Sequence, residues 1–148
     1  MKIIQSSEKK KILKQLEKQF GIKKLHYLFL RFGKEKIRLY SGNLSKEELN
    51  LLDRNLKIEN IGLYFAKQQK DGLRLTLDSL TILKNQITKN ILKINNKQAD
   101  EWLRGNDLQI KSDKNYKVLK YKNELIGCGK STEERITNSI PKERRIKN

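Results

Sequence analysis

The chain has 148 residues, of which 34 are Lys or Arg and 17 are Asp or Glu, so its formal net charge is +17. Its single Cys and single His exclude an internal disulfide framework, a cysteine-rich zinc site and a histidine-rich metal site. The surplus of positive charge is typical of proteins that bind polyanions, because Lys and Arg displace counterions from phosphates, and it favours a nucleic acid as partner.

The N-terminal part is predicted to begin with a helix followed by a β-hairpin. Residues 8–20 place apolar side chains at helical spacing, with Ser7 as the N-cap and Gly21 as the C-terminal stop. Residues 24–32 alternate as a strand, and residues 37–40 form its hairpin partner after a glycine turn. The polar face of the helix is rich in Lys, which is equally expected of an ordinary solvated helix face.

A second helix is predicted after the hairpin. Ser45 and Glu48 form a capping box, since each side chain can satisfy a backbone donor of the other residue. The helix runs to about Asn55 and is expected to bury three leucines: Leu49, Leu52 and Leu56. The sequence changes from helix-like to strand-like patterns near residues 57–60. We therefore expect an N-terminal α/β domain over 1–57 and a mostly β domain over 58–148.

The C-terminal domain is predicted to be a small β-barrel, because many short strands follow one another with turns between them. Asp71-Gly72 is a turn signal, residues 79–86 are a candidate short helix, and Asn96 can cap a helix over 97–104 that Gly105 ends. The strands are expected at 61–66, 73–77, 91–94, 108–110, 116–121, 125–130 and 136–140. The fold class is therefore α+β, with a small helix–hairpin–helix domain packed on a C-terminal barrel.

The glycines on both sides of Cys128 suggest a close approach to the strand over 125–130. Without a Cβ at Gly127 and Gly129, another backbone or a ligand phosphate can come near, and Lys130 stands beside the opening. The stretch is not a nucleotide-hydrolysing phosphate loop, because that motif needs four residues between its glycines. Cys128 itself is expected to be a small packed residue.

Basic and aromatic residues gather in the last third of the chain. Arg144 and Arg145 offer planar guanidinium groups that can grip a phosphate with two hydrogen bonds or stack on a base. Pro141 stiffens the approach to them. Trp102 and Tyr121 are possible stacking surfaces for unpaired bases, and a core position is the alternative for Trp102.

Residues 61–145 resemble the PUA-like RNA-binding domain at the C-terminus of bacterial rRNA 5-cytosine methyltransferases of the Sun/RsmF type. The matching pieces are Gly62–Tyr64, Trp102–Gly105, Ile126–Lys130 and Asn138–Arg145. A looser likeness over the whole chain is to the Nip-type pre-ribosome assembly factor of eukaryotes and archaea. The resemblance and the charge pattern together predict these RNA-binding residues: Arg104, Gly127, Gly129, Lys130, Arg135, Asn138, Lys142, Arg144 and Arg145.

The resemblance implies a PUA-like barrel that binds rRNA or tRNA. The chain shows neither the cofactor-binding domain nor the pair of catalytic cysteines of those methyltransferases, so we expect no catalysis, no cofactor and no metal. Its partner would be RNA, and with it an RNA methyltransferase or a pre-ribosomal particle. Two alternatives stay open: an RNA-processing enzyme with an unrecognised carboxylate or Lys site, and a protein–protein adaptor in ribosome assembly.

Two further expectations concern place and geometry. No apolar run is long enough to cross a bilayer, and the basic N-terminus lacks the apolar core of a signal peptide, so we expect a cytoplasmic protein without a membrane partner.

The strand that ends at Lys130 and the stretch from Asn138 to Arg145 should lie side by side. Lys130, Lys142, Arg144 and Arg145 would then form one basic patch.

Overall fold

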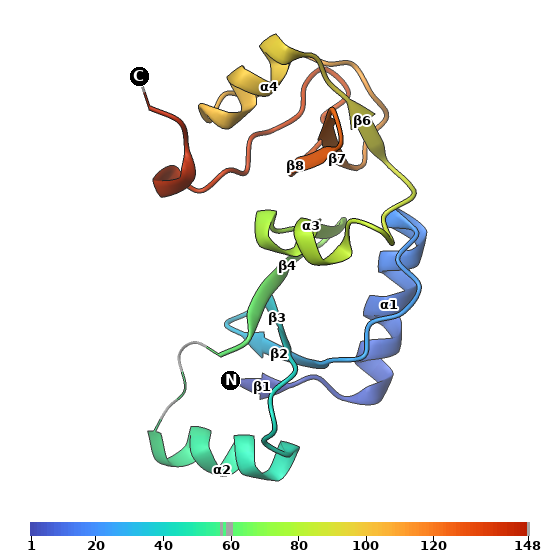
Figure 1. Cartoon of the computed structure of the whole chain (residues 1–148). Coiled ribbons are helices and arrows are strands. Elements are labelled where there is room, and N and C mark those ends of the chain that lie inside the picture. Colours follow the sequence, from blue (N-terminus) through green and yellow to red (C-terminus); the bar gives the residue numbers. More distant parts are fainter. Residues whose placement is uncertain (57, 59–60, 148) are drawn as a thin grey trace.

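The computed structural model describes residues 1–56, 58 and 61–147, which form two β-sheets and four α-helices in a mixed α+β arrangement, as expected (Figure 1). A five-stranded antiparallel sheet has the order β1-β2-β3-β4-β5, and a three-stranded sheet has the order β6-β7-β8. The first sheet contains β1 (Lys2–Ile3), β2 (Leu28–Phe32), β3 (Lys36–Tyr40), β4 (Leu63–Gln69) and β5 (Gly72–Leu75). The second contains β6 (Ile91–Lys93), β7 (Tyr116–Tyr121) and β8 (Glu124–Lys130).

The helices cover the ends and the junction of the two sheets. They are α1 (Ser6–Phe20), α2 (Lys46–Leu56), α3 (Leu77–Leu83) and α4 (Asn96–Leu103), and a short 3₁₀ helix, η1 (Lys142–Arg144), lies near the C-terminus. α2 and α4 lie at opposite ends of the molecule, and α3 lies between the sheets (Figure 1). None of the helices in the described ranges has the length and hydropathy that a bilayer crossing requires.

The first helix ends where the sequence predicts and begins differently. Gly21 adopts the left-handed conformation, with φ 78°, and its N–H donates to the carbonyl of Glu17. The N-cap is Gln5 rather than Ser7, so that prediction is wrong. The buried Ile4 donates its N–H to the carbonyl of Phe29 at 2.9 Å, and this sheet contact fixes the point at which the chain turns into the helix.

The predicted hairpin is confirmed, with β2 starting at Leu28 and pairing with β3. The Ser45 cap is also present, since the Glu48 N–H donates to Ser45 Oγ at 3.1 Å. Leu49 is fully buried against the first sheet, whereas Leu56 is 71% exposed, so its predicted burial is wrong. Leu56 lies on the same helix face as Leu49 but two turns later, at the last residue of α2, and outside the cluster that buries Leu49.

One hydrophobic core joins the two sheets. Leu73 and Leu75 of β5 belong to the same buried cluster as Tyr116, Val118 and Cys128 of the second sheet. The predicted domain boundary at residues 57–60 falls largely outside the described residues and stays a prediction. β3 and β4, which flank it, pair within one sheet.

The second sheet is smaller than the predicted set of strands. β6 runs parallel to β7, and β7 is antiparallel to β8. The stretches 108–110 and 136–140 lie beside the sheet through isolated bridges, Leu108 with Ile136 and Ser131 with Ile136, rather than as strands. The described strands therefore give a three-stranded sheet flanked by extended segments, and the closed barrel stays a prediction.

Candidate nucleic-acid interface

β8 and the segment 136–140 lie side by side, as the sequence predicts. The Thr137 N–H donates to the Lys130 carbonyl at 2.9 Å, and Ser139 Oγ donates to the Cys128 carbonyl at 2.5 Å. The two predicted parts of the interface therefore meet in space. The turn that joins them in the sequence is closed by the bridge between Ser131 and Ile136.

Trp102, on α4, is fully buried beneath this pair of segments. Its indole Nε1 donates to the carbonyl of Ile126 at 3.0 Å, so its polar atom is satisfied inside the protein. The ring has no exposed face on which a base could stack in this structure. Trp102 therefore occupies the core position that was its alternative interpretation. Tyr121 is half-buried, and its hydroxyl donates to Asn96 Oδ1 at 2.9 Å.

Gly127 and Gly129 allow other parts of the protein to approach β8 closely. A Cβ at Gly127 would lie 2.3 Å from Trp102 Nε1, and one at Gly129 would lie 2.4 Å from the carbonyl oxygen of Thr137. Both glycines are buried. Of the two close approaches that the sequence allows, the one by another part of the chain is therefore present, and the contact of these glycines with RNA stays a prediction.

Asn138 connects α4 to the segment beside β8. Its amide nitrogen donates to the carbonyls of Trp102 and Asn106 at 2.8 and 2.9 Å, and its Oδ1 accepts from the Ile140 N–H at 2.8 Å. The backbone N–H of Asn138 donates to Asp107 Oδ1 at 2.8 Å. The side-chain amide is thus engaged within the protein and positions the backbone of this segment, and the predicted contact of Asn138 with RNA stays a prediction.

Most of the predicted cations are held by acids on the protein. Arg104 Nε lies 3.0 Å from Asp100 and Arg135 Nε lies 3.7 Å from Asp107. Ion pairs with a carboxylate near the protein surface are easily exchanged for a phosphate, because each contributes little to stability. These two arginines lie near α4 and the segment beside β8, on the same part of the chain as Asn138.

Lys130 and Arg144 are held by acids on two different elements, the turn between β4 and β5 and helix α3. Lys130, at the end of β8, forms an ion pair with Asp71 in the turn between β4 and β5. Arg144 on η1 donates to Asp78 Oδ1 at 2.6 Å, at the start of α3. These partners divide the predicted basic patch into two separate contacts with the first half of the chain.

Arg145 and Lys142 differ in exposure. Arg145 is half-buried, its Nε donates to the carbonyl of Ile140 at 3.0 Å, and its side chain packs under Gly105. Lys142 is exposed on η1. Of the two, Lys142 is therefore the side chain that a ligand can reach most directly.

A cavity of about 100 Å³ lies where η1 meets β5 and β8, and it contains an arginine that the sequence reasoning missed. Arg74 of β5 and Arg144 both line it, together with Gly127 and Pro141. The Nε of Arg74 is buried and has no hydrogen-bond partner among the described residues. A buried guanidinium N–H without an acceptor is costly, so this cavity is suited to an anion that supplies one.

The sequence signal for Arg74 is weak. The residue alternates with Leu73 and Leu75 on a predicted strand, a pattern that is typical of any polar side chain facing away from the core. Lys67 lies opposite Arg74 across the hairpin, and the approach of η1, seventy residues later in the chain, adds Arg144 beside it.

Two reactive side chains near the site, those of Cys128 and Asp71, are buried or paired. Cys128 is 1% exposed, and burial raises the pKa of its thiol to about 12. The hydrogen bond from Lys130 holds the pKa of Asp71 below its usual value, with a further contribution from the Tyr116 hydroxyl. Among the described residues, no three His, Cys, Asp or Glu side chains are placed to hold a metal ion.

Comparison with known proteins identifies the C-terminal part of the chain. Residues 89–146 match the family model described as the methyltransferase RsmF PUA domain. The ribosomal RNA small subunit methyltransferase F of Psychromonas ingrahamii is 33% identical over 82 residues, which cover 53% of this chain and 17% of that relative. The proteins of the same name from Vibrio campbellii and Aliivibrio fischeri are 30% and 32% identical, over 56% of this chain and 19% and 18% of their own lengths.

The chain thus spans under a fifth of the length of the curated relatives it matches. The similarity confirms the predicted resemblance for the C-terminal part, over residues 89–146. The likeness of the whole chain to the Nip-type assembly factor stays a prediction.

Proposed function

We propose that residues 89–146, a PUA domain of the RsmF type, complete a PUA-like barrel that binds RNA, and that the chain acts in rRNA modification without carrying out the chemistry itself. The observation that carries this proposal is the family match over the segment that contains α4, β7, β8 and η1. The net charge of +17 supports it, since binding to a polyanion is the usual consequence of such a surplus.

The RNA we propose is that of the small ribosomal subunit, because the relatives are named for methylating it. The partner would be an RNA methyltransferase or a pre-ribosomal particle that presents this RNA. The named relatives carry such a segment as a small share of a larger protein.

The contact site we propose is the cavity between Arg74 and Arg144. A phosphate oxygen placed there would accept from the unpartnered Arg74 Nε and would replace Asp78 as the acceptor for Arg144. Lys142, exposed on the same short helix as Arg144, would add a second charge on the solvent side. Arginine suits this role because its planar fork can bind two phosphate oxygens at once.

The proposal that the chain is not catalytic rests on the state of its reactive groups. The thiol of Cys128 is buried and protonated at neutral pH. The carboxylates near the site, those of Asp71, Asp78, Asp100 and Asp107, are each paired with a cation of the protein.

The test is RNA binding by a matched pair of variants. Arg74→Ala with Arg144→Ala removes two charges from the cavity, and Lys46→Ala with Arg54→Ala removes two exposed charges from α2, at the far end of the molecule (Figure 1). Binding of a labelled fragment of small-subunit rRNA would be measured by fluorescence anisotropy at several salt concentrations. Circular dichroism would confirm that both variants fold.

We expect the cavity variant to bind more weakly and its log–log salt slope to be shallower by about 1.4, at about 0.7 for each lost phosphate contact with a single strand. The α2 variant should keep the slope of the unmodified protein. If the two variants behave alike, the site assignment is wrong. If the unmodified protein does not bind the RNA at all, the proposed function is wrong.

A further inference from the structure

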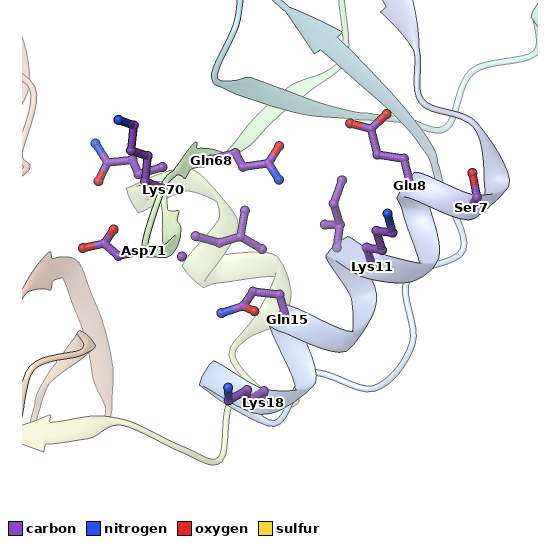
Figure 2. A pocket seen from close by; sticks show the side chains of 12 residues that line it. Ser7, Glu8, Lys11, Gln15, Lys18, Gln68, Lys70 and Asp71 are labelled. Atoms are coloured by element: carbon purple, nitrogen blue, oxygen red, sulfur yellow. The ribbon is translucent and has the colours of Figure 1, made fainter.

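A larger hollow, of about 760 Å³, lies between α1 and the hairpin of β4 and β5. It is far from α4 and is formed wholly by the first half of the chain. Figure 2 shows Lys11, Gln15 and Lys18 on the helix side, and Gln68, Lys70 and Asp71 on the hairpin side. Gln15 and Gln68 point into the space between the two elements. The hollow is therefore lined by cations and by amides that can donate and accept hydrogen bonds.

The two acids that line this hollow are already paired with cations outside it. Glu8 forms an ion pair with Arg31 of β2, and Asp71 forms one with Lys130 of β8. Figure 2 shows the Asp71 carboxylate pointing away from α1. By contrast, Lys11, Lys18 and Lys70 have no ion-pair partner among the described residues. The uncompensated charge of the hollow is therefore positive.

The walls of the hollow are held in place by Gln19. Its Nε2 donates to the Leu73 carbonyl at 3.0 Å, and its Oε1 accepts from the Leu73 N–H at 2.9 Å, so the side chain pairs with the free edge of β5. Gln15 donates to the same Oε1 at 2.8 Å. Gly72 lies so close that a Cβ there would be 2.8 Å from Gln19 Oε1. The distance between helix and hairpin is thus fixed before any ligand binds, which lowers the entropic cost of binding.

We propose that this hollow, the α1 groove, is a second RNA-binding surface that takes the phosphodiester backbone. Lys11 and Lys18 are two helical turns apart, about 10 Å along the axis, so their ammonium groups can contact two successive phosphates of one strand. The amides of Gln15 and Gln68 can exchange hydrogen bonds with ribose hydroxyls, which an RNA strand presents along the same path.

The α1 groove continues towards the C-terminal part of the chain. Asp71 lines both the groove and a neighbouring cavity of about 540 Å³, which is also lined by Lys114, Lys130 and Thr132. A strand of RNA can pass over the turn at Asp71 from one hollow to the other. The inference therefore rests on the proposed function and extends it, because it makes the N-terminal half a part of the RNA path.

The test compares two triple variants in the full chain. Lys11→Ala, Lys18→Ala and Lys70→Ala remove the three cations that line the α1 groove. Lys34→Ala, Lys46→Ala and Arg54→Ala remove the same charge from exposed positions outside it. The probe is a single-stranded RNA of about thirty nucleotides, long enough at the usual 4–16 nucleotides per site to cover both hollows. Affinity would be measured as a function of salt.

We expect the groove variant to lose about two units of salt slope, at about 0.7 for each lost phosphate contact, while the control keeps the original slope. Equal slopes in the two variants would overturn the inference. So would unchanged RNA binding together with lost binding to poly-glutamate, which would assign the groove to an acidic protein.

The cavity variant Arg74→Ala with Arg144→Ala, measured beside them, separates the two proposals. If it loses RNA and the groove variant does not, the proposed function stands and the groove inference fails. If only the groove variant loses RNA, the groove stands and the C-terminal site fails.

Discussion

Gly127 lies directly against the indole of Trp102, so closely that a Cβ on residue 127 would come within 2.3 Å of Trp102 Nε1. The same nitrogen donates to the carbonyl of the preceding residue, Ile126. The glycine is thus a requirement of packing between α4 and β8. This relationship shows why a glycine-rich strand beside basic residues can look like a phosphate site in the sequence when its space is already filled.

Replacement of Gly127 by Ala should destabilise the fold rather than block a ligand. Overpacking of a filled core costs about 1–3 kcal/mol, because neither the indole nor the strand can move freely. Urea unfolding at pH 7 measures the loss. Lys142→Ala is the control and should change the free energy of unfolding by no more than about 0.5 kcal/mol. A Gly127→Ala protein as stable as this control would contradict the packing.

Asn138→Ala should also act on stability. The substitution leaves the Asn106 carbonyl without its side-chain donor and the Ile140 N–H without its acceptor, and it removes one of the two donors to the Trp102 carbonyl. The loss should be about 1–3 kcal/mol in the free energy of unfolding, the usual cost of unpaired polar groups. The folded fraction should bind RNA as the unmodified protein does. A stable variant with weakened RNA binding would restore Asn138 as a ligand.

The Asp71 carboxylate should make stability depend on pH in the acid range. Hydrogen bonds from Lys130 and from the Tyr116 hydroxyl hold its pKa below 3.8 in the folded protein. A carboxylate with a depressed pKa stabilises the fold above its unfolded pKa, and the contribution disappears as the pH falls through the folded value.

The measurement is the stability difference between the unmodified protein and Asp71→Asn, followed by urea unfolding from pH 7 down to pH 2.5. The other acids titrate in both proteins and cancel. The difference should be constant above about pH 5 and should shrink below about pH 4. A difference that stays the same down to pH 2.5 would show that these contacts do not favour the charged form.

Cys128 should be inert towards thiol reagents in the native protein. The side chain is 1% exposed, and burial raises its pKa to about 12, so the reactive thiolate is scarce at pH 8. A chromogenic disulfide reagent should react with one thiol in guanidinium chloride and with almost none before unfolding. Rapid labelling of the folded protein would instead indicate an open, ligand-accessible strand β8.

The sequence predicts the ends of helices and strands well where a single residue determines the backbone conformation. The stop at Gly21, the hairpin around Gly33 and the turn at Asp71 each require a turn residue that the sequence shows directly. The helix over 97–104 is found one residue earlier, capped by Asn95 in place of Asn96, because both asparagines can accept from the first turn.

The parts that fail depend on contacts distant in the sequence. Leu56 has the spacing of a core residue, on the same face as Leu49, yet it is exposed at the last residue of α2, outside the cluster that buries Leu49. The stretch 136–140 has strand-like alternation, but Asn138 ties it to α4 instead. Arg74 becomes a candidate ligand only because η1 folds back over β5. The hydrophobic periodicity of the sequence gives no information about these long-range contacts.

If the chain binds RNA through its surplus of positive charge, its affinity must fall steeply as the salt concentration rises. The affinity of the unmodified protein for a small-subunit rRNA fragment would be measured from low to moderate salt. About five phosphate contacts predict a log–log slope on the order of −3.5 to −4.5. An affinity that barely changes with salt would contradict the account and would favour a protein–protein adaptor whose charge does not contact RNA.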